Sequence, residues 1–368
     1  MAKMRFFPAK SSSALLLGLW LLSSCTLPDR TNSPTDSDDN TALQGVYEIA
    51  KDKRGLILTH ENALTLPPAK VAVIVKIVTE SLEKAPVTAL VCEDFELAED
   101  SSKISFTESS FRVQNRPPNF HMSTLLLLDL SGSVIQHKLP ELRSATKKFI
   151  NTLFRDEARA NLKLAIYWFD GGEQINSLME FTPDTSRMLD AADAISVELS
   201  RDYSTNLNGA VIQGLDLLKK ETQKLKPPFV SHGSLVVFTD GTDRAARRST
   251  KEAQNAIATR GPALSAYTIG LGVEIDQKLL SAFGQDGFAY ADSNKEMEVK
   301  FAEIATSILN SIKSRYLVEY CSPKRRGRHN LTITAYNSKR RDLYGFLTVS
   351  FPADDFEGGC SVGESCSK

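Results

Sequence analysis

The sequence predicts an α/β protein in which a doubly wound domain is inserted into a small all-β sandwich. Residues 125–128 form a continuous apolar run, LLLL, typical of a strand that is buried on both faces of a parallel sheet. Strands and helices then alternate as far as residue 316, which is the order found in doubly wound sheets. On both flanks, the chain changes to short segments of alternating apolar and polar residues, the pattern of half-buried strands.

The central region, residues 118–316, is expected to form the doubly wound domain. Its first helix begins near Leu139 and has apolar residues on a single face, spaced as helix geometry requires. The same spacing between Met297 and Ile312 predicts a closing helix. Between these helices, we expect strands at 162–169, 235–240, 264–269 and 288–291, and a helix that contains residues 211–218.

The two flanks, residues 45–117 and 317–352, each have too few strands to make a sandwich alone. We therefore expect them to form one sandwich together, followed by a cysteine-containing tail at 353–368. A domain can be inserted in this way because the ends of compact domains often lie close together. The expected strands of the sandwich are 71–77, 87–91, 104–106, 111–113, 316–320, 331–335 and 343–351.

The first 25 residues have the pattern of a secretory signal peptide, with basic residues followed by a short apolar segment. Residues 22–25, LSSC, resemble a bacterial lipoprotein box, which implies that Cys25 is lipidated and attaches the protein to a membrane. Thr26 and Leu27 follow instead of an acidic residue, which resembles outer-membrane sorting in enterobacterial lipoproteins. The alternative is an ordinary secretory signal in which Cys25 is incidental. Residues 26–44 are polar and predict a disordered tether.

Three oxygen-bearing side chains follow the apolar run directly: Asp129, Ser131 and Ser133. They fall at the carboxyl end of a strand, where open α/β sheets bind ligands. One carboxylate and two hydroxyls on a tight turn suit a hard cation that prefers oxygen, although an ordinary loop or helix cap has the same composition. Two later stretches favour the cation site, because Thr205 precedes a helix and Asp240 ends a second apolar strand.

The order, spacing and strand context of these residues resemble the von Willebrand factor type A domain, over roughly residues 118–316. That resemblance implies a Rossmann-like fold. It also implies that Asp129, Ser131, Ser133, Thr205 and Asp240 form a metal-ion-dependent adhesion site. The ion would be Mg²⁺, or Mn²⁺ or Ca²⁺, since oxygen ligands suit all three. Because only two of the five ligands are charged, a bound dication would keep residual positive charge and an open position for an acidic group of a protein partner.

Composition and cysteine content set further limits. The formal net charge of −1 does not suggest a nucleic-acid-binding protein. No segment after the signal has the ~20 apolar residues needed to span a bilayer, so lipid on Cys25 would be the only membrane attachment. Four other cysteines fit an oxidising compartment and allow three pairings. We favour Cys321 with Cys360, which leaves Cys92 to pair with Cys366 or to remain free.

These observations predict a binding protein rather than an enzyme. The five histidines are scattered, and the chain has neither a Gly-x-Ser-x-Gly elbow nor a phosphate-binding glycine loop. The predicted function is divalent-metal-dependent protein binding, in adhesion or complex assembly, by a lipid-anchored protein of the bacterial cell envelope. One alternative is an envelope scaffold whose metal is only structural. A metal-assisted hydrolase is the less favoured alternative.

Overall fold

The computed structural model describes residues 47–81, 84–105, 109–115, 117–155, 161–226, 229–363 and 366. The predicted signal peptide (1–25), the lipidation site Cys25 and the tether (26–44) lie outside the described residues. Within the described part of the chain, no helix is both long enough and apolar enough to cross a membrane.

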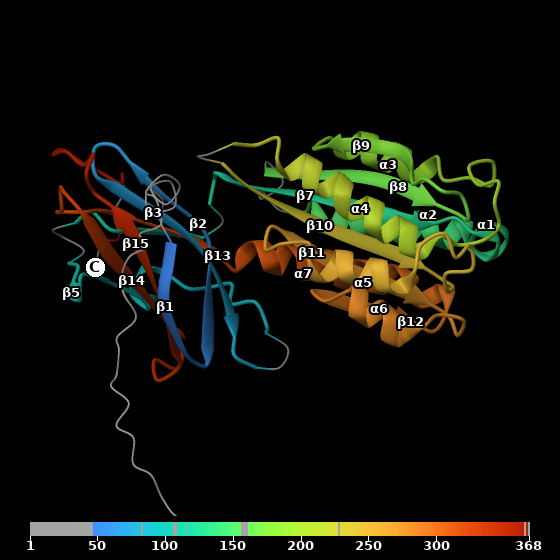
Figure 1. The fold of residues 1–368 in the computed structure, drawn as a ribbon. Helices are drawn as coiled ribbons and strands as arrows, with labels where there is room; N and C mark the ends of the chain where they lie inside the picture. The colour runs from blue at the N-terminus through green and yellow to red at the C-terminus, as the bar shows by residue number, and fades with distance from the viewer. Residues whose placement is uncertain are drawn as a thin grey trace, which may run out of the picture. The chain divides into compact units, whose positions relative to one another are not determined.

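The central domain is built on a six-stranded sheet with the order β12-β11-β10-β7-β8-β9 (Figure 1). All neighbouring strands are parallel except β8 and β9, which are antiparallel. The strands are β7 (Phe120–Asp129), β8 (Leu162–Phe169), β9 (Asn176–Thr182), β10 (Val230–Thr239), β11 (Leu264–Leu271) and β12 (Gly287–Ala291). The apolar run of β7 lies inside the sheet, with β10 on one side and β8 on the other.

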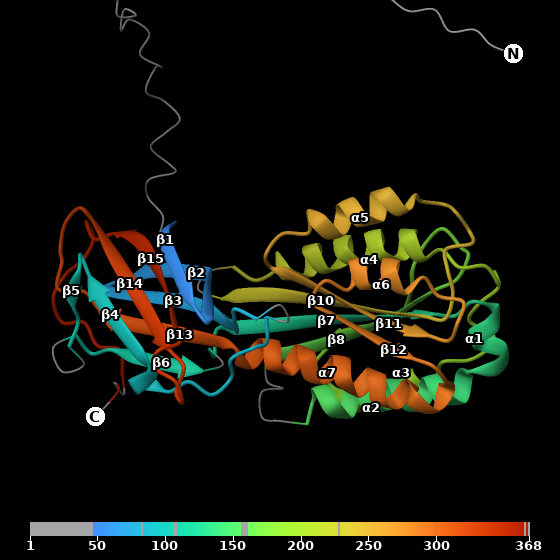
Figure 2. The ribbon, with the colours of Figure 1, turned by 90° about the horizontal axis from the view of Figure 1, so that it is seen from below.

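Helices cover both faces of this sheet, as Figure 2 shows. Alternate residues of β7 supply the two cores: Leu126 and Leu128 pack in the core that includes residues of α2, α3 and α7. Leu125 and Leu127 pack in the other core, with residues of α4, α5 and α6. The helices are α1 (Gly132–His137), α2 (Leu139–Leu153), α3 (Thr185–Asp193), α4 (Leu207–Thr222), α5 (Thr250–Ala258), α6 (Gln277–Phe283), α7 (Met297–Lys313) and the 3₁₀ helix η3 (Asn294–Glu296).

The sandwich is built from strands on both sides of the inserted domain. One sheet has the order β2-β3-β13-β6 and the other β1-β15-β14-β4-β5. Each sheet combines strands from both flanks, because β3 pairs with β13 in one sheet and β4 pairs with β14 in the other. The strands are β1 (Tyr47–Arg54), β2 (Leu56–Leu66), β3 (Lys70–Thr79), β4 (Phe95–Glu99), β5 (Ser102–Lys103), β6 (Arg112–Asn115), β13 (Arg315–Cys321), β14 (Arg328–Tyr336) and β15 (Tyr344–Pro352), with the 3₁₀ helix η1 (Cys92–Asp94). The predicted fold class, a doubly wound domain within a two-flank sandwich, is confirmed.

Three details of the sandwich differ from the sequence prediction. The expected strand at 104–106 is not found, because its described residues 104 and 105 lie outside any strand and the short strand β5 precedes them. Residues 87–91 are not a strand, although Leu90 is buried and its amide donates a hydrogen bond to the Tyr316 hydroxyl at 3.1 Å. An apolar run this short can fill a core without joining a ladder. Conversely, β1 and β2 were not predicted. A register shift between His60 and Asn62 interrupts the alternation of β2, which removes the two-residue period that identifies a strand.

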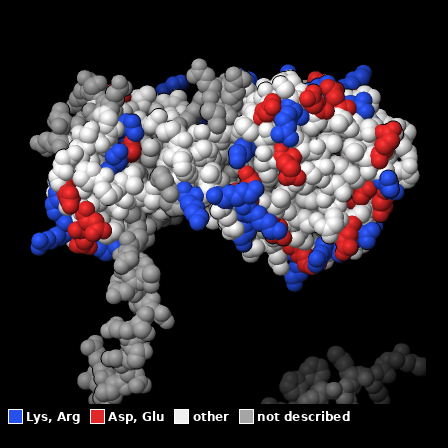
Figure 3. All heavy atoms as spheres, turned by 90° about the horizontal axis from the view of Figure 1, so that it is seen from above, with Lys and Arg blue, Asp and Glu red and all other residues white. Residues whose placement is uncertain are grey.

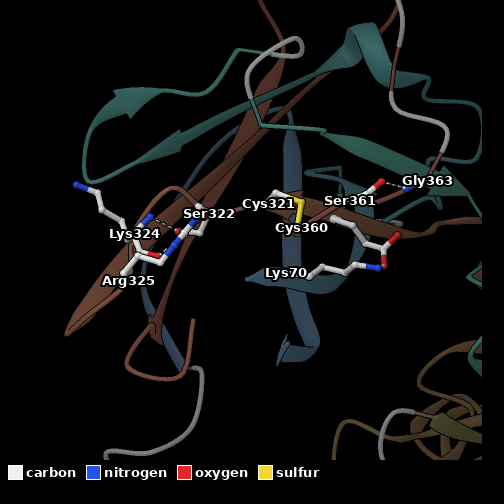
Figure 4. Close-up of a disulfide and its surroundings, with 9 residues drawn as sticks. Lys70, Cys321, Ser322, Lys324, Arg325, Cys360, Ser361 and Gly363 are labelled. Carbon is white, nitrogen blue, oxygen red and sulfur yellow. Dashed lines mark hydrogen bonds and ion pairs between the residues drawn. A yellow bond between two sulfur atoms is a disulfide. The ribbon is translucent and has the colours of Figure 1, made fainter. Parts of the chain in front are cut away.

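Two disulfides hold the C-terminal tail against the sandwich. Cys321, the last residue of β13, is bonded to Cys360 (Figure 4). Cys92 is bonded to Cys366, across a sequence separation of 274 residues that includes the whole inserted domain. The first pairing is the one favoured from the sequence, and the second is one of the two possibilities left open for Cys92.

Candidate metal centre

The candidate site lies at the carboxyl edge of the central sheet. Asp129 is the last residue of β7, and Asp240 directly follows β10. These strands are neighbours in parallel register, with Leu128 opposite Phe238, so the two aspartates emerge side by side. The hydroxyl of Thr239 donates a hydrogen bond to Asp129 Oδ2 at 2.6 Å, which joins the two strand ends.

The turn after β7 carries the two serines of the predicted site. The backbone amide of Ser131 donates a hydrogen bond to Asp129 Oδ1 at 2.9 Å, which closes the turn. Gly132 then lies against the loop at 203, and its amide donates to the Tyr203 carbonyl at 3.1 Å. Ser133 completes the link between the strand ends by donating its hydroxyl to Asp240 Oδ1 at 2.9 Å. The Ser131 hydroxyl is buried and makes no hydrogen bond of good geometry, although it lies near enough to Asp129 to lower the pKa of that carboxyl.

Thr205 reaches the same edge from the loop before α4. Its carbonyl accepts hydrogen bonds from the amides of Arg244 and Ala245, both at 3.0 Å, so it is fixed to the loop that follows Asp240. Its side-chain oxygen lies 4.0 Å from the position that a β-carbon on Gly241 would occupy. The structure therefore brings all five predicted ligands to one edge of the sheet.

Asp170, which directly follows β8, supports the loop that precedes α4. Its side chain is 5% exposed and accepts hydrogen bonds from the Gly172 amide at 2.7 Å and the Ser200 hydroxyl at 3.0 Å. The amides of Arg201 and Asp202 also donate hydrogen bonds to Asp170 Oδ2, both at 3.3 Å. A buried carboxylate that collects this many donors fixes the backbone that leads to Thr205. Its position after a parallel strand was the only sequence signal for this role.

Lys138 is the second contributor that sequence analysis missed. It lies between α1 and α2, and its Nζ forms an ion pair with Asp240 Oδ2. The two oxygens of Asp240 are therefore bonded to Ser133 on one side and Lys138 on the other. No spacing rule identifies this lysine, because its contact depends on how α1 turns back over the sheet edge.

The three arginines after Asp240 do not form a free cationic surface. Arg244 pairs with Glu274, Arg247 with Asp202, and Arg248 with Glu252. Figure 3 likewise shows Lys and Arg interspersed with Asp and Glu over the face that it draws. Attraction of an acidic ligand by these arginines is therefore offset by the chain's own carboxylates.

The electrostatics of the site centre on Asp129, which is completely buried. Burial raises the pKa of its carboxyl to about 7, and the hydrogen bond from Thr239 opposes only part of that shift. The nearby carboxylate of Asp240 raises the pKa further. A cation placed between the two aspartates would remove the cause of both effects, since it would replace lost hydration and offset like-charge repulsion.

The residues present fit an oxygen-coordinated divalent cation. No group of three or more His, Cys, Asp or Glu side chains in the described residues could hold a metal. The candidate set consists instead of two carboxylates and three hydroxyls, which are oxygen donors. The buried hydroxyl of Ser131 favours a missing ligand, since it makes no hydrogen bond of good geometry and buried polar groups usually make one.

A doubly wound sheet with an oxygen-donor cluster at its carboxyl edge defines the class of this protein: it carries a von Willebrand factor type A domain. Residues 125–305 match the family model of that name. Such domains are commonly used for protein–protein interaction and metal-dependent adhesion, and they often bind a divalent metal at the adhesion site.

Known proteins resemble the chain at low identity. Inter-alpha-trypsin inhibitor heavy chain H1 of Mesocricetus auratus is 24% identical over 213 residues, which cover 54% of this chain and 22% of that protein. Heavy chain H3 of Bos taurus is 23% identical over 202 residues, covering 53% and 22%. A solved von Willebrand factor type A structure from Catenulispora acidiphila has a TM-score of 0.43 at 11% identity, over 84% of this chain and 75% of that one. The chain thus spans about a fifth of the length of these curated relatives.

The raised pKa of Asp129 predicts that metal affinity depends on pH. Metal binding requires the carboxylate, so below about pH 7 a cation must displace a proton. We expect affinity for Mg²⁺ to fall about tenfold between about pH 8 and about pH 6, with release of about one proton at the lower pH. Calorimetric titration in buffers of different ionisation enthalpy measures both quantities. Equal affinity at the two pH values would contradict the prediction.

In the ion-free protein, the same raised pKa makes the stability of the fold decrease as the pH rises. Asp129 has a native pKa of about 7, above its ordinary value of 3.8, so the native state binds a proton that the unfolded state has released. This group therefore stabilises the ion-free protein at low pH, and its contribution disappears as the pH rises through about 7. Ion binding then becomes most favourable where the ion-free site is least stable.

Proposed function

We propose that this chain binds a protein partner through a divalent ion held by Asp129, Ser131, Ser133, Thr205 and Asp240. The convergence of these five residues at one sheet edge, with the buried Ser131 hydroxyl making no hydrogen bond of good geometry, carries the proposal. The aspartates would supply the charge, while the hydroxyls would complete the coordination without neutralising the ion. When bound, Mg²⁺ or a similar ion would supply an electrophilic position that an exposed acidic residue of the partner can fill.

The side chains around the site would provide specificity. Tyr203 lies in the loop that contacts Gly132 and is 65% exposed, so its ring is available to a partner beside the site. Val273, in the segment after β11 at the same carboxyl edge of the sheet, is 92% exposed. Aromatic residues are enriched at protein interfaces, so we infer that the partner presents an acidic residue next to apolar surface.

We further propose that lipid on Cys25 anchors the protein in the bacterial cell envelope, at the outer membrane. The resemblance of residues 22–25 to a lipoprotein box supports this proposal. The tether at 26–44 could then hold the folded part away from the membrane surface. The two disulfides favour a compartment outside the cytosol.

The test of the function is calorimetric titration of residues 44–368, a single compact unit, with Mg²⁺, Mn²⁺ and Ca²⁺ after chelation. We expect one ion per chain, and Asp129→Asn should lower the affinity more than about hundredfold, since even outer-shell changes cost about 10–100-fold. Asp216→Asn, an exposed aspartate of α4, is the matched control and should leave binding unchanged.

Partner capture separates the proposed function from its alternatives. Capture from envelope extracts should need the ion and fail with Asp129→Asn, whereas a scaffold with a structural ion would lose only thermal stability in that variant. Failure of the wild-type chain to bind any of the three ions would sink the proposal unless the partner and ion bind together. Turnover of a phosphoester or peptide that disappears in Asp129→Asn would favour a hydrolase instead.

A further inference from the structure

The ion pair between Lys138 and Asp240 places a positive charge inside the candidate metal centre. The side chain of Asp240 is 1% exposed and that of Lys138 is 20% exposed, so the pair is largely removed from water. A buried carboxylate without a counter-charge would be costly, and Lys138 supplies that counter-charge from within the chain. The inference below rests on the proposed function, because it concerns the same five ligands.

The backbone holds Lys138 in position for this contact. Its amide donates a hydrogen bond to the Val134 carbonyl at 2.9 Å, which closes α1. Its carbonyl accepts a hydrogen bond from the Leu142 amide at 2.9 Å, which opens α2. A residue that ends one helix and begins the next has little freedom to move, so only its side chain can leave Asp240.

We propose that Lys138 is a tethered counter-ion of the site, which takes the place of the divalent ion's charge in the ion-free protein and lowers the affinity for that ion. Two carboxylates would meet a dication with a net charge of −2, but Lys138 reduces this to −1. The ion must either displace the ammonium group from Asp240 or bind beside it, and both alternatives weaken binding.

The positive charge of Lys138 would also increase the contribution of the partner's acidic group to the binding free energy. By formal charge, the two aspartates alone balance a dication, so the residual positive charge expected from the sequence needs Lys138, with which the sum is +1. An acidic group from the partner restores neutrality only when the lysine is present. Lys138 would therefore shift binding free energy from the ion alone to the ion together with the partner.

The test compares Lys138→Gln, which keeps a hydrogen-bond donor but removes the charge, with the wild-type chain. We expect the Mg²⁺ affinity of the variant, measured by calorimetry on residues 44–368, to be about tenfold higher than that of wild type. The reason is that the ion no longer has to displace the ammonium group from Asp240 or bind beside it. Thermal melting provides a second measurement of the role of this charge. The variant should melt at lower temperature than wild type in chelator and gain more from Mg²⁺. Lys147→Gln in α2, whose lysine pairs with the exposed Asp193, is the matched control and should change neither quantity.

The outcomes separate this inference from the proposed function. If wild type and Lys138→Gln bind Mg²⁺ equally, the counter-ion role is overturned while the proposed function stands. If neither binds, both are overturned. A variant that folds only in the presence of Mg²⁺ supports the inference, since the ion then replaces the missing charge. A variant that stays unfolded in Mg²⁺ overturns it, because the lysine would then be needed for folding itself.

Discussion

Replacing Arg315 with methionine is expected to lower the free energy of unfolding by about 3–5 kcal/mol, the usual cost of leaving one partner of a buried ion pair uncompensated. Arg315, the first residue of β13, is completely buried where the inserted domain returns to the sandwich. Its guanidinium forms a two-bond ion pair with Glu61, at 2.6 Å from Nε and 2.9 Å from Nη2. Methionine would fill much of the volume but would leave the Glu61 carboxylate without its cation.

The surroundings of Arg315 indicate why this pair is specific to the fold. Glu61 occupies the register shift of β2, and a bulge of this kind redirects a side chain. The other guanidinium nitrogen reaches Ser311 of α7, and the charge lies 4.7 Å from the ring centre of Phe120. Burial lowers the pKa of His232 well below its usual range, and Arg315 lowers it further, so this neighbour stays neutral. One arginine thus joins elements of both domains.

Urea denaturation of residues 44–368 measures the effect of Arg315→Met. Arg340→Met is the matched control, because Arg340 and Asp342 form a pair whose side chains are 64% and 63% exposed. Exposed ion pairs contribute little to stability because water screens both charges, so the control should be nearly neutral. The double variant Glu61→Leu with Arg315→Met should recover much of the loss. A single variant as stable as wild type would show that the pair does not stabilise the junction.

The sequence was sufficient to predict five of the six strands of the central sheet, all except β9, and the side chains that lie at its carboxyl edge. The apolar run at 125–128 has an unambiguous pattern because both faces of β7 are covered, and the polar residues that follow must then lie at the carboxyl edge. The site's supporting residues were not predictable in the same way. Asp170 and Lys138 act through the loop at 200–206 and through Asp240, and these contacts depend on the path of the chain rather than on spacing.

The junction between the domains was also beyond sequence analysis. Arg315 and Glu61 are 254 positions apart in the sequence, and neither falls in a motif. Glu61 interrupted the alternation that would have identified β2, so the residue that stabilises the junction is also the one that hid the strand. The break in the strand pattern of β2 is thus explained by the pairing of Glu61 with Arg315, a residue that is distant in the sequence.

Strand β10 connects the junction to the candidate metal centre. His232, near the start of β10, accepts a hydrogen bond from the Arg315 guanidinium at 3.4 Å, and Asp240 directly follows the end of the strand. At about 3.3 Å per residue, these two positions are roughly 25 Å apart. The strand is buried and paired on both sides, so it fixes the site at a constant distance from the sandwich. The stability of the central core should therefore affect both the junction at Arg315 and the candidate metal centre.

Phe301→Ala, in the middle of α7, is expected to lower the free energy of unfolding by about 3–5 kcal/mol, as large-to-small changes in aromatic core residues do. Phe301 is completely buried between two other rings, with centroids 5.3 Å from Phe238 and 6.4 Å from Phe149. Phe238 belongs to β10, so the cavity would open directly against the strand that carries the site. The surrounding helix and sheet are too constrained to close it fully.

Fluorescence during urea unfolding can follow this change within the central domain alone. Trp168, in β8, is the single tryptophan of residues 44–368, since the other tryptophan of the chain is Trp20. Val299→Ala, on the same helix but 54% exposed, is the matched control and should cost less than about 1 kcal/mol. Circular dichroism reports both domains at once, so coincident transitions would mean that the sandwich unfolds with the insert. If Phe301→Ala shifts the Trp168 transition alone, the junction at Arg315 does not couple the two domains. If it shifts neither, α7 does not stabilise the central core as its packing indicates.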